Sequence, residues 1–209
     1  FEPLPASGEE ALEVARLWDS TATANGPGGH GQRFPAESLS GAAATEGAVK
    51  TRTPGHRVLH LATHGFFLGS DCHRTPRTPR GIGGLTSDST PNSAPAAAEN
   101  PLLRAGLALA GANHRGSAGA AEEDGVLTAE EIGALDLSGI EWAVLSGCDT
   151  GLGELETGEG VLGLRRAFQV AGARAVIMSL WPVEDEVARL WMRALYKGRL
   201  EQGLGTAEA

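Results

Sequence analysis

The sequence predicts an α/β protein with a largely parallel sheet and helices on both faces. Short apolar runs of strand length alternate along the chain with amphipathic stretches of helix length. Hydrophobic residues make up 41% of the 209 residues, which is enough for one domain with a sizeable core. No internal repeat is evident, so residues 1–209 are expected to form a single domain.

Five segments are predicted to be helices, from apolar residues spaced three or four apart or from capping signals at their starts. They are residues 6–18, 42–50, 128–136, 158–173 and 183–200. Ser7 and Glu10 fit a capping box at the start of the first helix. The expected apolar face of the last helix consists of Val187, Leu190, Trp191, Ala194 and Leu195.

Four apolar runs are predicted to be strands, and polar or glycine-rich segments separate them as loops. The strands are residues 56–65, 105–111, 140–146 and 174–181, and the main loops are residues 20–33, 69–100 and 112–125. The segment 69–100 is rich in Pro, Ser, Thr, Gly and Arg. Because such a composition buries little apolar surface, this loop is expected to be flexible.

Composition and charge exclude several classes of partner. A net charge of −9 repels phosphate backbones, which argues against nucleic acid and favours a basic substrate. Two cysteines, Cys72 and Cys148, cannot build a disulfide framework, so a reducing, cytoplasmic compartment is expected. No apolar run approaches the roughly 20 residues of a membrane span. The chain begins at Phe1 without a methionine and stops where a helix is about to start, so we expect a fragment of a longer protein.

Two of the predicted strands end in a reactive residue beside a glycine. One strand ends in His64-Gly65, and another is followed by Gly147-Cys148. Because parallel strands bring their carboxyl ends to one edge of a sheet, an imidazole and a thiol would meet there if these strands are neighbours. The histidine can take the thiol proton or protonate a leaving amine, and the amides of Gly65 and Cys148 can hold an oxyanion. Taken singly, the cysteine suggests a small buried side chain and the histidine a turn.

Four long blocks of the sequence resemble the CHAT domain family, in the family's order. They are VLHLATHGFF, NPLLRAGLALAGAN, DGVLTAEEIGALDLSGIEWAVLSGCDTGLGE and GEGVLGLRRAFQVAGARAVIMSLWPVEDE. The resemblance runs from about Leu4 to the end of the chain and places His64 and Cys148 at the family's catalytic dyad. It implies a caspase-like three-layer α/β/α sandwich with a mostly parallel central sheet, in clan CD with caspases and separase.

The same resemblance implies a function and a setting. The implied activity is that of a cysteine endopeptidase that hydrolyses protein or peptide substrates without a cofactor. Family members usually lie at the C-terminal end of bacterial proteins, after tetratricopeptide or similar repeats that control the peptidase. The family's first strand and final helix region are absent from the sequence, which would leave the sheet incomplete at its edges but not affect the dyad.

Two acidic residues are candidates for substrate binding. Asp149 follows the predicted nucleophile, where the family often has an acid, although a turn-forming role explains it equally well. Asp185 lies in SLWPVEDE, which is similar to a separase block whose acid recognises a basic side chain before the scissile bond. Its alternative role is that of an acid in the first turn of a helix, where it complements the dipole.

Other functions have weaker support in the sequence. A zinc site made of His60, His64, Cys72 and His73 matches no known ligand spacing, so no metal is expected. His60 is expected instead to be a packed histidine beside the dyad. No phosphate-binding loop or G-x-G-x-x-G motif follows a first strand, which argues against a nucleotide-binding domain. The main alternative to a peptidase is a catalytically silent, caspase-like interaction or scaffold module.

Overall fold

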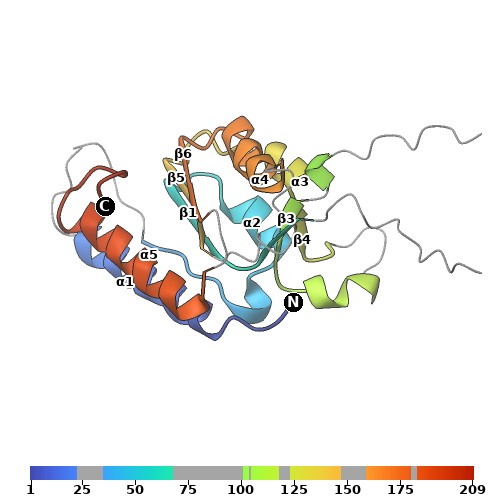
Figure 1. Ribbon diagram of the computed structural model, residues 1–209, viewed down its shortest axis with the longest axis horizontal. Helices are drawn as coiled ribbons and strands as arrows, with labels where there is room; N and C mark the ends of the chain where they lie inside the picture. Colours follow the sequence, from blue (N-terminus) through green and yellow to red (C-terminus); the bar gives the residue numbers. More distant parts are fainter. Residues whose placement is uncertain (23–34, 68–100, 104, 118–122, 147–158, 180–182) are drawn as a thin grey trace, which may run out of the picture.

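Two three-stranded sheets organise the part of the chain described by the computed structural model, which comprises residues 1–22, 35–67, 101–103, 105–117, 123–146, 159–179 and 183–209. The parallel sheet has the strand order β1 (Val58–Ala62), β5 (Trp142–Ser146), β6 (Ala175–Met178). The antiparallel sheet has the order β2 (Gly65–Phe67), β3 (Ala105–Ala108), β4 (Val126–Thr128). The predicted parallel sheet is therefore present, whereas the antiparallel sheet was not foreseen (Figure 1).

Helices cover both faces of the parallel sheet. α1 (Pro5–Ala22) and α5 (Asp185–Leu200) pack side by side on one face, while α3 (Ala129–Gly133) and α4 (Glu159–Val170) lie on the other (Figure 1). The central strand β5 is buried at all five residues, as expected for a parallel strand covered on both sides.

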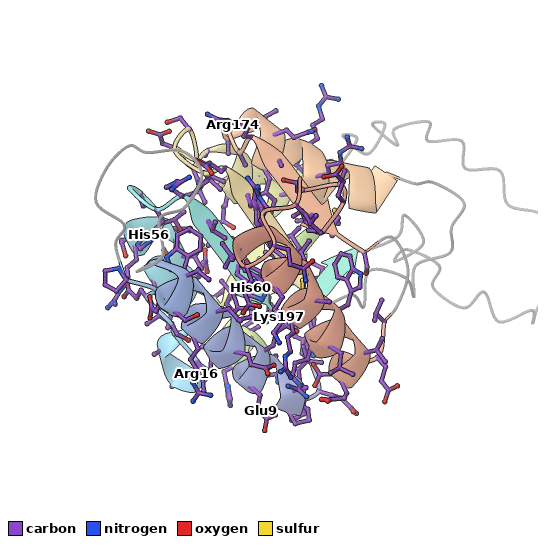
Figure 2. The ribbon with its side chains drawn as sticks, turned by 90° about the vertical axis from the view of Figure 1, so that its left-hand side faces the viewer. Glu9, Arg16, His56, His60, Arg174 and Lys197 are labelled. Carbon is purple, nitrogen blue, oxygen red and sulfur yellow. The ribbon has the colours of Figure 1, made fainter. Side chains whose placement is uncertain are left out.

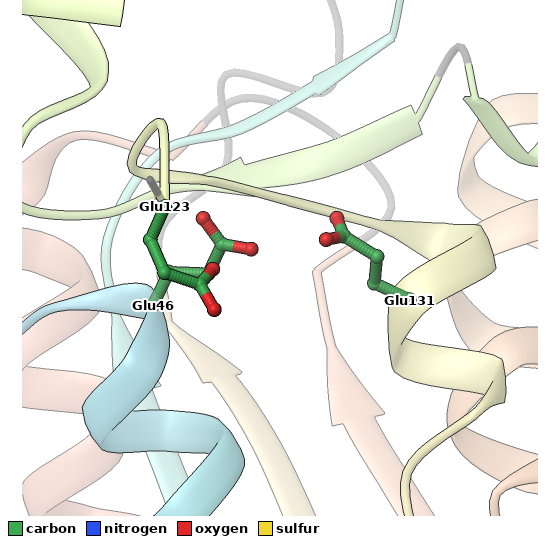
Figure 3. A group of neighbouring side chains, drawn as sticks. All are labelled: Glu46, Glu123 and Glu131. Atoms are coloured by element: carbon green, nitrogen blue, oxygen red, sulfur yellow. The ribbon is translucent and has the colours of Figure 1, made fainter. Parts of the chain in front are cut away.

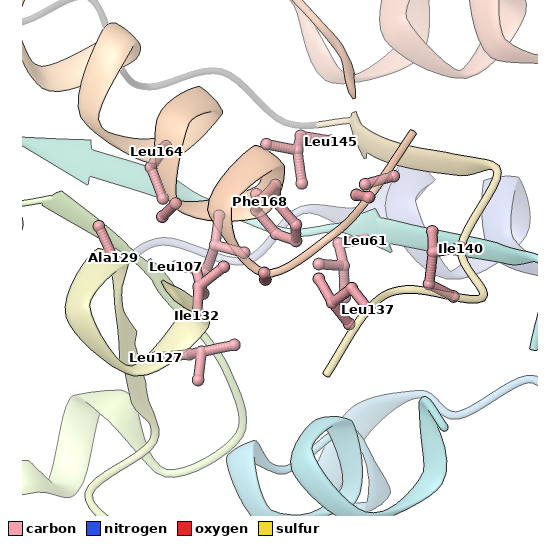
Figure 4. Close-up of a cluster of buried hydrophobic side chains, with 14 of the residues drawn as sticks. Leu61, Leu107, Leu127, Ala129, Ile132, Leu137, Ile140, Leu145, Leu164 and Phe168 are labelled. Carbon is pink, nitrogen blue, oxygen red and sulfur yellow. The ribbon is translucent and has the colours of Figure 1, made fainter. Parts of the chain in front are cut away.

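Alternate residues of β5 belong to two separate hydrophobic clusters, because successive side chains of a strand point to opposite faces. Ala143 and Leu145 pack in the larger cluster, which also joins both sheets to α3 and α4 (Figure 4). Trp142 and Val144 pack in the smaller cluster beneath α1 and α5. The smaller cluster consists of Val14, Trp142, Val144, Met192, Leu195 and Tyr196.

The predicted apolar face of α5 is buried at Leu195 but not at its other four positions. In α4, Leu164 and Phe168 are buried. In α5, Met192, Leu195 and Tyr196 are buried, whereas the predicted face residues Val187, Leu190 and Trp191 are each about half exposed, at 49%, 50% and 51%. The helix carries two apolar rows, and apolar spacing alone does not indicate which row faces α1 and the sheet.

The start of α1 also differs from the prediction. Ser7 and Glu10 do not form a capping box, because the Ser7 hydroxyl donates to the Leu4 carbonyl and Glu10 turns inward. The Ala6 amide donates instead to the Asp185 carboxylate at 2.7 Å. The capping signal at the predicted helix 128–136 is confirmed, since Thr128 and Glu131 form a complete capping box at α3.

Most remaining predictions hold with shifted boundaries. The predicted strand 56–65 breaks at Thr63–His64 into β1 and β2, which belong to different sheets. The short helix is α2 (Glu46–Arg52), and three 3₁₀ segments are η1 (Gly41–Ala43), η3 (Pro101–Leu103) and η4 (Ala112–Ser117). The loop predicted at 69–100 lies outside the described residues. Among the helices described here, none has the length and apolar character needed to span a membrane.

Candidate active site

His64 lies at the corner where the chain leaves the parallel sheet and enters the antiparallel one. The Thr63 amide donates to the carbonyl of Ser146 at the end of β5 (3.0 Å), and the Thr63 hydroxyl donates to the carbonyl of Ala108. The Ala108 amide donates in turn to the carbonyl of His64 at 2.9 Å. The backbone around His64 is thus hydrogen-bonded to both sheets, which fixes the position of the His64 Cα atom.

The ends of β1 and β5 are in register, as the sequence predicted for parallel neighbours. Ala62, the last residue of β1, pairs with Ser146, the last residue of β5. His64 and Cys148 each follow this pair by two residues in the sequence. Gly147, Cys148 and Asp149 lie outside the described residues, so the contact between the imidazole and the thiol stays a prediction.

The imidazole of His64 is oriented by a backbone carbonyl. Its Nε2 lies 2.6 Å from the carbonyl oxygen of Glu2. A carbonyl oxygen only accepts hydrogen bonds, so Nε2 carries the proton, and a neutral ring then has its lone pair on Nδ1. The ring of Phe1 packs beside the imidazole at a centroid distance of 5.6 Å. Nδ1 is therefore the atom of His64 that can accept a proton.

The amide of Gly65 points away from the neighbouring strand. In an antiparallel pair, hydrogen-bonded and non-hydrogen-bonded residue pairs alternate. Because the Ala108 amide donates to His64, the next pair, Gly65 with Leu107, is the non-hydrogen-bonded kind. β2 is also the edge strand of its sheet within the described part of the chain. The Gly65 N–H is thus directed away from β3.

A cavity of about 850 Å³ borders this corner. It lies between α1, α2 and β1, and its lining includes His64, Glu2 and Asn113. Ligand pockets of proteins commonly have volumes of roughly 300–1,000 Å³, so the space suits a small ligand or a short peptide segment.

Of the two residues predicted to bind substrate, Asp185 lies within the described part of the chain. Its carboxylate makes a contact between two helices. Asp185 is the first residue of α5, and its carboxylate accepts the hydrogen bond from the Ala6 amide near the start of α1. This contact caps α1 with a side chain of α5, a role that the sequence did not predict. The position of Asp185 in the first turn of α5 fits the alternative role given by the sequence. Recognition of a basic residue by Asp185 stays a prediction.

His60 is packed, as expected, in a buried polar chain that involves three elements. Its Nε2 lies 2.8 Å from the carboxylate of Glu10 in α1, and its Nδ1 lies 3.2 Å from the hydroxyl of Tyr196 in α5. Glu10 is 1% exposed and Tyr196 is 0% exposed. Burial and the Glu10 charge raise the pKa of Tyr196, which keeps its hydroxyl protonated. Figure 2 shows His60 behind α1 and α5.

A second polar cluster joins α2 to α3. Glu46, Glu123 and Glu131 converge (Figure 3), and the Lys50 ammonium contacts all three carboxylates at 2.6, 3.0 and 2.9 Å. The cation of this cluster is thus the lysine. Glu46 is 2% exposed, and one of its oxygens has no hydrogen-bond partner among the described atoms. Burial, together with a hydrogen bond to Glu123, raises the pKa of Glu46 to about 7.

Sequence reasoning missed two contributors to the surroundings of His64. One is the Glu2 carbonyl, which no side-chain pattern can reveal. The other is Asn113, whose side chain contacts the backbone of Phe1. The only signal for Asn113 was its place at the end of the block NPLLRAGLALAGAN, directly after a predicted strand.

Comparison with known proteins identifies the family of the chain. The parallel strand ends and the histidine between two sheets define a mixed α/β domain with a candidate catalytic edge. A family model described as "CHAT domain" matches residues 1–209. The chain belongs to the CHAT domain family, a caspase-like family of peptidase clan CD.

The relatives found among curated proteins are much longer than the chain. It is 27% identical over 212 residues to Tetratricopeptide repeat protein 28 of Mus musculus, and 26% identical over 203 residues to the protein of that name in Homo sapiens. Each match covers 95% of the chain and 7% of the relative. No solved structure matches the chain.

Proposed function

We propose that the chain is a cysteine endopeptidase in which Cys148 is the nucleophile and His64 the proton carrier. The observation that carries this proposal is the register of β1 and β5, whose last residues pair immediately before the two sequence positions concerned. Membership of a caspase-like peptidase family supports it. Within this proposal residues 1–209 form one caspase-like sandwich domain.

The first half of the reaction is acyl transfer to the thiol. The Nδ1 atom of His64 takes the proton of Cys148, and the thiolate attacks the scissile carbonyl carbon. The carbonyl oxygen becomes an oxyanion as a tetrahedral intermediate forms. When the intermediate collapses, the C–N bond breaks, and the imidazolium returns its proton to the leaving amine.

The second half releases the acyl group. A water molecule gives its proton to Nδ1 of His64 and attacks the thioester carbon to form a second tetrahedral intermediate. When this collapses, the C–S bond breaks, the carboxylic acid product leaves, and the imidazolium returns its proton to the Cys148 thiolate. In both halves the oxyanion needs donors that are already in place. The Gly65 amide points away from β3, which supports its role as one donor. The backbone amide of Cys148, directly after Gly147, is proposed as the second donor.

Substrate selection is proposed to rest on acidic residues. Asp149 and Asp185 would favour a basic side chain before the scissile bond. For Asp185, this role competes with its contact to Ala6, so Asp185→Asn is the informative variant. Because asparagine can still cap α1, the variant separates substrate preference from stability. Equal cleavage of peptides with Lys and with Leu before the scissile bond, in wild type and variant alike, would remove this part of the proposal.

The regulatory setting is proposed from the relatives. Their name refers to tetratricopeptide repeats, and the match covers only 7% of their length. We propose that a repeat domain in the full-length protein binds a partner and thereby controls the peptidase. A bacterial, cytoplasmic setting is proposed from the family resemblance and the two cysteines, not from these two mammalian relatives.

The proposed activity is tested with a mixed peptide library whose products are identified by mass spectrometry. Wild-type protein is compared with Cys148→Ala and His64→Ala, and circular dichroism verifies that each variant is folded. Loss of cleavage in both folded variants is expected. Unchanged turnover in either variant would refute the dyad.

A second function, that of a non-catalytic interaction module, is favoured by one surface feature. Val187, Leu190 and Trp191 form a row on α5, and each is about half exposed. Exposed apolar rows of this kind are common at protein interfaces. Labelling with an electrophilic peptide separates the two functions, because an activated Cys148 reacts much faster than free cysteine, whereas an unactivated thiol does not.

A further inference from the structure

The contact that orients His64 depends on a segment held by one side chain. Asn113 makes two hydrogen bonds to the backbone of Phe1: its Oδ1 accepts from the Phe1 nitrogen at 2.6 Å, and its Nδ2 donates to the Phe1 carbonyl at 2.9 Å. An asparagine amide has an acceptor and a donor in one plane. The two contacts therefore fix both the position and the direction of the backbone that leads to Glu2.

Asn113 itself stands on a well-fixed turn. η4 follows β3, and the Ala112 and His114 amides donate to the carbonyls of Leu109 and Gly111. Gly125 has φ +78°, and a Cβ on it would lie 2.3 Å from the Ala112 nitrogen. Only glycine permits this close approach between the start of η4 and the segment before β4.

Both partners of the Glu2–His64 contact are therefore anchored to β3. The amide of Ala108, the last residue of β3, holds the His64 carbonyl, and Asn113, five residues further along, holds the Phe1 backbone. The Phe1 ring adds packing against His64 and Phe66, with centroid distances of 5.6 and 5.9 Å. Figure 1 shows the N-terminus beside the helix formed by residues 112–117.

We propose that Asn113 is a positioning residue for His64. It holds the Phe1–Glu2 backbone so that the Glu2 carbonyl faces Nε2, and the lone pair of the neutral imidazole stays on Nδ1. This inference rests on the proposed peptidase function for its effect on turnover, but the effect on the imidazole is independent of that function. Without Asn113, Nε2 loses its fixed acceptor, and a larger share of the rings carries its proton on Nδ1.

The direct test is the tautomer of His64, measured by ¹⁵N NMR of the histidine side chains in the whole chain. His64→Gln assigns the signals. In the wild type we expect the Nε2–H tautomer to dominate, and in Asn113→Ala we expect both ring nitrogens to shift toward averaged values. Asn113→Asp loses the Nδ2 donor to the Phe1 carbonyl and gains a negative charge beside the Phe1 amino group. Because the contact to the carbonyl is lost, the nitrogens should shift in the same direction. Wild-type nitrogen shifts in both variants would overturn the proposal.

Arg115→Ala is the matched control. Arg115 also lies in η4, on the other side of a kink at His114, and pairs with Asp124 at 2.7 Å, so this variant loosens η4 without removing a contact to Phe1. Its His64 signals should match those of the wild type. Equal shifts in Arg115→Ala and Asn113→Ala would show a general effect of η4 and refute the specific role of Asn113.

Turnover gives a second readout. If the chain cleaves peptides, Asn113→Ala should lower kcat about tenfold with little change in KM, because correct protonation of a general base contributes to the chemical step. A wild type without activity would refute the peptidase proposal, and the NMR result would still decide the role of Asn113.

Discussion

The two histidines around strand β1 have opposite surroundings. His60 lies within the strand, and both of its ring nitrogens have partners, Glu10 and Tyr196, which are themselves buried. His64 lies two residues after the strand ends, and among the described residues the hydrogen-bond partner of its ring is the Glu2 carbonyl at Nε2. The comparison shows that a histidine with one nitrogen fixed can serve as a base, whereas one with both nitrogens fixed connects structural elements.

The difference arises from where each residue lies relative to the end of the strand. His60, inside β1, projects into the layer between the sheet and the helices α1 and α5, where any polar group must find a partner. Past Ala62 the chain turns toward β2, and the side chain reaches the edge of the sheet next to the cavity. His64→Ala should therefore affect mainly catalysis, and His60→Ala mainly stability.

The largest expected effect is on catalysis by His64. If the proposed reaction is correct, His64→Ala should lower kcat by about 10³-fold or more, since a dyad member provides both the base and the acid. Its free energy of unfolding, measured by urea denaturation, should change by less than about 1 kcal/mol. A large loss of stability in this variant would contradict the contrast with His60.

The next effect is on stability at His60. His60→Ala leaves the buried Glu10 carboxylate without its partner, which should cost about 3–5 kcal/mol of unfolding free energy. Urea denaturation of the single and double variants measures it. Glu10→Leu combined with His60→Leu replaces the pair with apolar groups and should recover most of that loss. A double variant as unstable as the sum of the two single variants would show that the pairing is not the cause.

A third prediction concerns Glu46, which, like Glu10, is a buried acid. The pKa of Glu46, raised to about 7 by burial and by Glu123, means that the folded state holds a proton that the unfolded state loses near pH 4.5. The raised pKa of Glu46 thus does not affect the free energy of unfolding below pH 4.5. It lowers that free energy progressively as the pH rises from 4.5 to 7, and the loss reaches its full size above pH 7. Glu46→Gln should gain about 2 kcal/mol over the wild type at pH 8, measured by urea denaturation, and almost nothing at pH 4.

Glu131 serves as the control for that experiment, because its pKa is shifted in the opposite direction to that of Glu46. Burial acts to raise its pKa, but hydrogen bonds from Thr128 and Lys50 outweigh burial and lower the pKa. The ionised form therefore stabilises the fold above pH 4.5, and this contribution is lost as the pH falls further. Glu131→Gln should destabilise the protein at pH 8. Equal signs for the two variants would contradict the assigned roles.

The smallest loss of stability is expected at Tyr196, the last residue of the buried polar series Glu10–His60–Tyr196. Tyr196→Phe removes the hydrogen bond to His60 Nδ1 but preserves the ring that packs on Trp142. Thermal unfolding should show a loss of about 1 kcal/mol, typical of one hydrogen bond whose partner stays buried. A loss as large as that of His60→Ala would mean that the Tyr196 hydroxyl, rather than the contact between His60 and Glu10, contributes most of the stability.

Sequence patterns predicted the elements better than their contacts. The strands that became β1, β5 and β6 were recognised, because their apolar runs are local and strand ends are marked by glycine or polar residues. The buried face of α5 was missed, since two apolar rows on one helix have equal local signals. The capping box at Ser7 was wrong, because Asp185, far along the chain, supplies the cap of Ala6.

The sequence by itself determined the parallel sheet and the strand ends near His64, since both follow from the short-range order of apolar and polar residues. Only the tertiary structure decided which groups hold each histidine. His60 meets partners 50 and 136 residues away, and His64 meets Glu2 at a separation of 62. Such contacts form between elements that packing brings together, and the contact to Glu2 uses a backbone atom that every residue has.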